Sequence, residues 1–190
     1  MIQIGLNDEK FIRGAVPMTK SEVRAITLSK LQLGKQNSVV DIGAGTGSIT
    51  VECALNVSAG VVYAIDKNEQ ASELIKQNIA HFKLNNVQVV KGLAPLAIPE
   101  LDSVDRVVIG GSGGQLAAIF KWLSHKLPLG GIVVANCITL ENTVKIIENL
   151  KLYNYKNIEV VQASIARGKA LADLTMMLAN NPVYIISGER

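Results

Sequence analysis

Short runs of apolar and β-branched residues alternate along this chain with longer segments whose apolar residues recur at helical spacing. This alternation is typical of βαβ units wound into a parallel sheet. The runs predict seven strands, at 38–42, 61–65, 87–90, 104–109, 132–135, 158–163 and 183–186. We therefore expect an α/β fold in which helices flank a seven-stranded, mostly parallel sheet.

Helical spacing predicts one helix before the first strand and four crossover helices, at 19–31, 48–54, 69–82, 115–126 and 141–152. Thr19 followed by Glu22 predicts a capping box at the start of the first helix. Residues 168–181 show no clear helical pattern, so we expect a hairpin-like reversal at the sheet edge that makes the last strand antiparallel. The sequence contains no linker or repeat, and we expect residues 1–190 to form one domain.

Composition narrows the class of protein only in part. The N-terminus lacks the apolar region of a signal peptide, and no run reaches the ~20 apolar residues of a membrane helix, so we expect a cytoplasmic protein that spans no membrane. Cys53 and Cys137 lie far apart, without the spacing of a zinc site. They are expected to be reduced core thiols, with no bound metal. The net charge of +3 suits a polycarboxylate substrate or nucleic acid and decides between neither.

A glycine-rich turn joins the first strand to the following helix, at Gly43, Ala44, Gly45, Thr46 and Gly47. Glycines at this edge of a doubly wound sheet let the backbone approach a ligand closely. Ser48 stands where a dinucleotide-binding loop would have its third glycine, so a pyrophosphate site is not indicated. Asp66 ends the second strand, where a carboxylate can accept hydrogen bonds from ribose hydroxyls. The alternative is that Asp66 caps the next helix.

A second glycine-rich segment follows the fourth strand, at Gly110, Gly111, Ser112, Gly113 and Gly114. The earlier Asp-x-Gly-x-Gly-x-Gly segment, Asp41 to Gly47, resembles the first motif of Rossmann-like methyltransferases. Many of these that act on amino nitrogens carry Asn/Asp-Pro-Pro-Tyr after the fourth strand, and its absence here disfavours methylation of an exocyclic amine. A floor with almost no side chains suits a large flat substrate or the cofactor itself. The alternative is a flexible loop before the next helix.

Several segments together resemble the decarboxylating precorrin and cobalt-precorrin C(15)-methyltransferases of cobalamin biosynthesis, across nearly the whole chain. They are Phe11-Ile12-Arg13, Pro17 to Arg24, Asp41 to Ser48, Asp105-Arg106-Val107, Ile109 to Gly114 and Asn181-Pro182-Val183. The resemblance implies the Rossmann-like fold of class I methyltransferases, with S-adenosylmethionine (SAM) as cofactor. It further implies methylation at carbon 15 of a corrin precursor and loss of carbon dioxide from an acetate side chain.

When the cofactor contacts of the family are transferred to the matching positions of this sequence, the resemblance implies that SAM is contacted by Thr19, Gly43 to Gly47, Asp66 and Ala94. It also implies a separate carbon-5 methyltransferase in the same pathway and a homo-oligomer, a tetramer in this family. The polycarboxylate substrate has six candidate partners, each of which is alternatively a solvated surface charge: Arg13, Lys20, Arg24, Arg106, Arg167 and Lys169.

No acid or base is assigned from the sequence, because His81 and His125 fall near helix ends, remote from the motif loops. Two other functions stay open. One is a transfer RNA or other RNA adenine methyltransferase, although 4% aromatic residues offer few stacking platforms for bases, so we expect no nucleic acid partner. The other is a non-catalytic adenosine-binding subunit.

Overall fold

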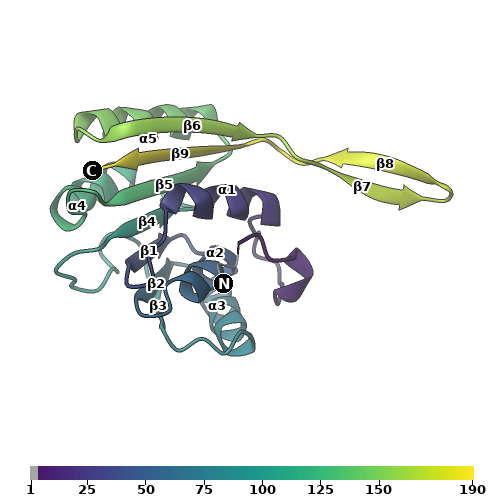
Figure 1. Ribbon diagram of the computed structural model, residues 1–190, viewed down its shortest axis with the longest axis horizontal. Helices are drawn as coiled ribbons and strands as arrows, with labels where there is room; N and C mark the ends of the chain where they lie inside the picture. The colour runs from purple at the N-terminus through teal and green to yellow at the C-terminus, as the bar shows by residue number, and fades with distance from the viewer. Residues whose placement is uncertain (1–3) are drawn as a thin grey trace.

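The protein is described over residues 4–190 by a computed structural model. Its seven-stranded sheet has the order β3-β2-β1-β4-β5-β9-β6 (Figure 1). The strands are β1 (Ser38–Ile42), β2 (Val61–Asp66), β3 (Val87–Lys91), β4 (Arg106–Ile109), β5 (Ile132–Cys137), β6 (Lys156–Ala163) and β9 (Val183–Glu189). The first five run parallel, while β9 lies antiparallel between β5 and β6. The expected mostly parallel sheet with an antiparallel last strand is confirmed.

Five helices cover the two faces of this sheet: α1 (Ser21–Leu31), α2 (Ser48–Asn56), α3 (Glu69–His81), α4 (Leu116–Lys126) and α5 (Leu140–Leu152). Each strand of a parallel sheet is buried on both faces, so its residues are apolar almost without interruption. Val39 packs in the core under α1 and α2, whereas Val40 and Ile42 pack in the core under α4 and α5. Helices packed on both faces therefore fix the sheet, and with it the positions of the strand ends from which the loops emerge.

The start of α1 differs from the sequence expectation. The helix begins at Ser21, and its N-cap Lys20 makes no side-chain capping bond. The capping box of Thr19 and Glu22 is therefore wrong. Its place is taken by Asp8, in the short 3-10 helix η1 (Asp8–Lys10), whose Oδ1 accepts a hydrogen bond from the Ser21 backbone N–H at 3.0 Å. A carboxylate distant in sequence satisfies a donor that a local residue was expected to satisfy.

Between β6 and β9 the chain leaves the sheet and forms a separate two-stranded antiparallel hairpin, β7 (Ala166–Leu171) and β8 (Leu174–Ala179). We call residues 166–179 the arm. Figure 1 shows the arm projecting well beyond the rest of the molecule. The absence of a helix here is confirmed, but the sequence did not indicate these two strands, because neither has a face that packs on a core.

Within residues 4–190, no helix has the length and apolar character needed to cross a membrane.

Candidate functional site

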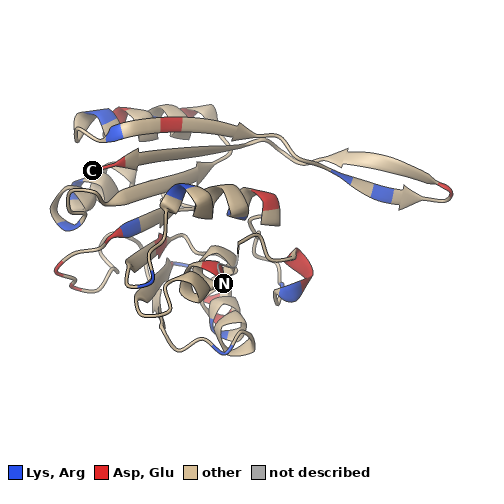
Figure 2. Ribbon diagram, viewed as in Figure 1, with Lys and Arg blue, Asp and Glu red and all other residues tan. Residues whose placement is uncertain are grey.

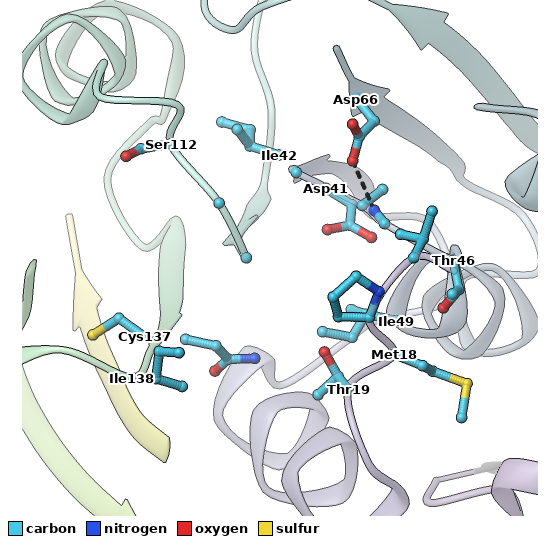
Figure 3. A pocket seen from close by; sticks show the side chains of 18 of the residues that line it. Met18, Thr19, Asp41, Ile42, Thr46, Ile49, Asp66, Ser112, Cys137 and Ile138 are labelled. Carbon is cyan, nitrogen blue, oxygen red and sulfur yellow. Dashed lines mark hydrogen bonds between the residues drawn. The ribbon is translucent and has the colours of Figure 1, made fainter. Parts of the chain in front are cut away.

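A cavity of about 630 Å³ opens at the carboxyl ends of β1, β2, β4 and β5. This is the edge at which α/β sheets collect ligands, and the volume is typical of a small-molecule site. Residues 16–20, which we call the strap, form one wall and come from the segment before α1. Figure 3 shows Met18, Thr46 and Asp66 on one side of the cavity and Ser112, Cys137 and Ile138 on the other.

The two glycine-rich loops pack directly against each other at the floor of the cavity. The backbone N–H groups of Gly43 and Ala44 donate to the Ile65 carbonyl at 2.8 and 3.2 Å, which fixes the first loop to the end of β2. Gly43 has a φ of +72°, and a Cβ on it would lie 2.6 Å from the backbone nitrogen and oxygen of Gly111. No residue with a side chain fits at Gly43 unless the second loop moves.

Asp66 lies where the sequence placed it, at the end of β2 and on the cavity wall. Its Oδ2 accepts a hydrogen bond from the Gly45 backbone N–H at 2.9 Å, drawn in Figure 3, and its Oδ1 accepts one from the Asn68 N–H at 2.9 Å. Asn68, not Asp66, caps α3, because its side chain accepts from the Gln70 N–H at 2.8 Å. The alternative interpretation of Asp66 as a helix cap is therefore wrong. Each oxygen of the oriented carboxylate can accept a further hydrogen bond.

Two buried polar residues, Asp41 and Thr46, also belong to the lining of the cavity. Asp41 is 1% exposed and accepts a hydrogen bond from the Thr50 hydroxyl at 2.6 Å. Burial, with a smaller contribution from the charge of Asp66, raises the pKa of Asp41 to about 6. Thr46 is 1% exposed, and its hydroxyl has no hydrogen-bond partner within the described residues. A buried polar group of this kind is usually satisfied by a ligand or by water.

Most of the residues singled out in the sequence meet at this cavity. Its lining includes Thr19, Lys20, Gly43, Ala44, Gly45, Thr46, Asp66, Ala94, Gly110, Gly111, Ser112 and Gly113. Gly47 and Gly114 do not line it. Gly47 instead precedes α2 with a φ of +77° and packs on Ile75, where a Cβ would approach within 3.1 Å. Its conformation serves the turn into the helix.

The basic residues are distributed differently from the expectation. Arg24, a predicted substrate contact, is fully buried between Asp8 at 2.9 Å and Glu52 at 2.7 Å, and it also donates to backbone carbonyls. That prediction is wrong, because no donor of Arg24 reaches the cavity. Arg106 lies at the opposite end of its strand and donates to the Leu31 carbonyl. Burial lowers the pKa of Arg106.

Three further basic residues lie outside the lining as well. Arg13 forms an ion pair with Asp8 at 3.8 Å, and Arg167 pairs with Asp8 and Glu22. Lys169 is exposed on the arm. Of the six predicted basic contacts, Lys20 alone lines the cavity.

Sequence reasoning missed a wall formed by the ends of β5 and β6 and the start of β9. It includes Asn136, Cys137, Ile138, Ile165 and Asn180. Asn136 had an available signal, since it directly follows the apolar run 132–135 and so stands at a strand end. Lys67, next to Asp66, was also missed. His81 and His125 occupy the last turns of α3 and α4, away from the lining.

Comparison with known proteins gives a consistent result. A family model described as "Precorrin methyltransferase domain" matches residues 10–190. A Sulfurisphaera tokodaii protein named "Probable cobalt-precorrin-6B C(15)-methyltransferase (decarboxylating)" is 42% identical over 98% of this chain and 97% of its own.

Two crystal structures from the same group are also similar. A Geobacter metallireducens precorrin-6y C5,15-methyltransferase is 37% identical, with a TM-score of 0.92 over 98% of both chains. A Methanobacterium thermoautotrophicum precorrin 8w decarboxylase is 35% identical, with a TM-score of 0.91 over 97% of this chain and 100% of its own. The fold is that of class I methyltransferases, and the chain belongs to the precorrin methyltransferase domain family.

Proposed function

We propose that the cavity binds S-adenosylmethionine and that the protein methylates carbon 15 of cobalt-precorrin-6B while an acetate side chain of the substrate loses carbon dioxide. The observation that carries the proposal is the contact between Gly43 and Gly111 on the floor of a cavity whose wall bears the oriented Asp66 carboxylate. The names of the relatives supply the substrate and the carbon atom.

The chain's residues fit this cofactor at three points. Gly43 and Gly45 offer bare backbone on the cavity lining while the second loop and the strap pack closely on them, and Asp66 can accept hydrogen bonds from a ribose. The unpartnered Thr46 hydroxyl and the buried Asp41 carboxyl offer polar contacts for the amino acid part. When bound, SAM supplies a methyl group on a positively charged sulfur, which is a good leaving group.

Positioning is the main task left to the protein. Holding donor and acceptor in line can contribute about 7–11 kcal/mol to lowering the barrier. A conjugated tetrapyrrole can deliver electrons from a ring carbon, so the transfer requires no nucleophilic side chain. The strap and the two glycine-rich loops would enclose the reacting atoms, and Lys20 and Lys67 on the lining can pair with carboxylates of the substrate.

The test follows the mass of the product. The purified protein is incubated with methyl-labelled SAM and cobalt-precorrin-6B, and the expected product has gained one methyl group and lost one carbon dioxide. Methyl gain without loss of carbon dioxide would remove the decarboxylase half of the proposal. Failure to bind S-adenosylhomocysteine in calorimetry would remove the whole proposal.

We further propose partners and an assembly. The Sulfurisphaera tokodaii protein is matched over 97% of its length, and its name gives the C(15) activity alone. This supports a separate carbon-5 methyltransferase in the pathway. The cytoplasm is the proposed compartment, because both cysteines are free thiols. The family resemblance implies a tetramer, and the arm is the surface we assign to it, since its apolar side chains Leu174, Met176 and Leu178 are exposed.

A further inference from the structure

The far wall of the cavity contains polar groups but no charged ones. The charged side chains of the described lining, Lys20, Asp41, Asp66 and Lys67, come from the strap and from the ends of β1 and β2. The wall formed by residues 136–138, 163–165 and 180–183 instead combines asparagine amides with apolar side chains. A carboxylate of the substrate that reaches this wall would contact neutral hydrogen-bond donors among apolar side chains.

The amide of Asn136 is held by a side-chain hydrogen bond. Its Nδ2 donates to the hydroxyl of Thr27 at 3.0 Å, and Thr27 is fully buried in α1. The Thr27 hydroxyl has one proton, which it donates to the Val23 carbonyl at 2.8 Å, so towards Asn136 it acts as an acceptor. The Asn136 Oδ1 also lies 3.2 Å from this hydroxyl, so Thr27 holds the amide group in place from one side. The second N–H of the Asn136 amide has no partner among residues 4–190 and remains for a ligand.

A neutral hydrogen-bond donor suits a carboxylate that must leave the substrate as carbon dioxide. Decarboxylation converts a charged carboxylate into neutral carbon dioxide, so a cation beside that carboxylate stabilises the ground state more than the transition state. An amide N–H orients the group with much less stabilisation of its charge. The apolar side chains of Ile138 and Val183 on the same wall offer the carboxylate no hydrogen bond and so do not stabilise its charge either.

We propose that Asn136, held by Thr27, binds and orients the acetate carboxylate that leaves the substrate as carbon dioxide; this inference rests on the proposed function. The bond between the acetate methylene and the carboxylate carbon breaks. Its electron pair is held by the conjugated macrocycle and then forms the new C–H bond, when the methylene takes a proton that originates from water and becomes a methyl group. No oxidant or reductant is consumed.

Two substitutions at Asn136 separate this role from a structural one. Asn136→Lys is expected to bind cobalt-precorrin-6B more tightly yet release carbon dioxide at least about thirtyfold more slowly, because the cation stabilises the carboxylate. Asn136→Asp repels the substrate and is expected to bind it more weakly and to slow the same step. Thr27→Val frees the amide and is expected to slow carbon dioxide release by about tenfold. Asn142→Asp, at an exposed position of α5 outside the cavity lining, is the matched charge control.

The measurements are substrate affinity, release of labelled carbon dioxide in a single turnover, and binding of S-adenosylhomocysteine as a check on folding. Unchanged carbon dioxide release in Asn136→Asp, or faster release in Asn136→Lys, overturns the inference. If Asn136→Lys fails to bind S-adenosylhomocysteine, Asn136→Asp and Thr27→Val decide the question. A wild-type protein that releases no carbon dioxide from cobalt-precorrin-6B overturns the proposed function instead.

Discussion

At the scale of single residues, Asp41 is a carboxylate held at a cost to stability. Its carboxyl keeps a proton up to about pH 6 in the folded protein, whereas the ordinary pKa is 3.8. Because the folded pKa is raised, the free energy of unfolding falls as pH rises through this interval and stays lower above it. The substitution Asp41→Asn removes the titrating group and with it this pH-dependent loss of stability.

We expect Asp41→Asn to raise the free energy of unfolding by up to about 3 kcal/mol at neutral pH and by almost nothing near the ordinary pKa of the acid. Urea unfolding across this pH range measures the difference. The same variant should bind S-adenosylhomocysteine about tenfold more weakly at neutral pH, because an ionised group on the cavity lining is lost. Equal stabilisation at all pH values would contradict the assignment of the titration to Asp41.

Gly43 and Gly130 allow a matched comparison, because both have positive φ but different surroundings. A Cβ on Gly43 would lie 2.6 Å from Gly111 backbone atoms, whereas one on Gly130 would have nothing within 4 Å. Gly130→Ala should therefore cost only the left-handed strain, about 1 kcal/mol. Gly43→Ala should cost at least about 3 kcal/mol and abolish binding of S-adenosylhomocysteine. Similar losses in both variants would show that the contact between the loops is unimportant.

The sequence predicted the glycine-rich and acidic lining of the cavity better than the positions of the basic residues, for a physical reason. The loop at Gly43 and the carboxylate of Asp66 follow from local rules about strand ends and backbone conformation. Whether an arginine faces a cavity depends instead on distant partners. Arg24 looks like a substrate contact in the sequence, yet Asp8 and Glu52 surround it in the fold.

At the scale of elements, the same ion pairs hold the N-terminal segment against α1 and α2. Glu52 in α2 accepts from Arg24 and from the backbone N–H groups of Gly5 and Leu6. Asp8 joins Arg24 to Ser21 at the start of α1. The strap continues from this segment, so its position over Gly45 depends on the network, and a Cβ on Gly45 would lie 3.3 Å from the Pro17 carbonyl oxygen.

Replacing the central cation should be far more costly than replacing an exposed one. Arg24→Met leaves Asp8 and Glu52 buried without their shared partner, and we expect a loss of about 3–5 kcal/mol in the free energy of unfolding. Lys30→Met removes the more exposed ion pair with Glu159 and should cost less than about 1 kcal/mol. Denaturant unfolding of both variants measures the difference. A loss for Arg24→Met as small as for Lys30→Met would mean that the network stabilises little.

Element by element, the inner strands β1, β2, β4, β5 and β9 were predictable because burial leaves an apolar run in the sequence. The edge strands β3 and β6 are more exposed but keep β-branched residues typical of strands. The arm was not predictable on this basis. Arg167, Gly168 and Lys169 in β7 show no apolar alternation, and every residue of β8 is exposed. β8 is an apolar run in the sequence with one threonine, yet it packs on nothing within its own chain, so an apolar run alone does not show what a strand packs against.

At the scale of the whole molecule, the arm is the feature whose stability is not explained by contacts within a single chain, because the side chains of β8 are exposed. An isolated two-stranded hairpin is at best marginally stable in water. Opposite residues share a face, so Leu171 and Leu174 lie together at one end, and Met176 and Leu178 follow beside Lys169 and Arg167 of β7. Figure 2 shows charges on β7 and at the tip of the arm but none along β8. Contact with other copies of the chain would cover these apolar side chains.

We therefore expect light scattering to find an oligomer of the wild-type protein, which the family resemblance implies is a tetramer. The triple variant Leu174→Ser, Met176→Ser and Leu178→Ser should be monomeric, because it removes the apolar surface proposed for assembly while leaving the body of the molecule intact. It should bind S-adenosylhomocysteine within about twofold of wild type, because no arm residue among 166–179 lines the cavity.

The control substitutes the exposed leucines of the body, Leu96 at 93% and Leu129 at 89% exposure, with serine and should leave the oligomer unchanged. A monomeric wild-type protein, or a triple variant that remains oligomeric, would show that the arm does not hold the copies together. Cofactor binding that is lost together with assembly would instead mean that the base of the arm acts on the strap. Arg167, which joins β7 to Asp8 and Glu22, provides the connection for such an effect.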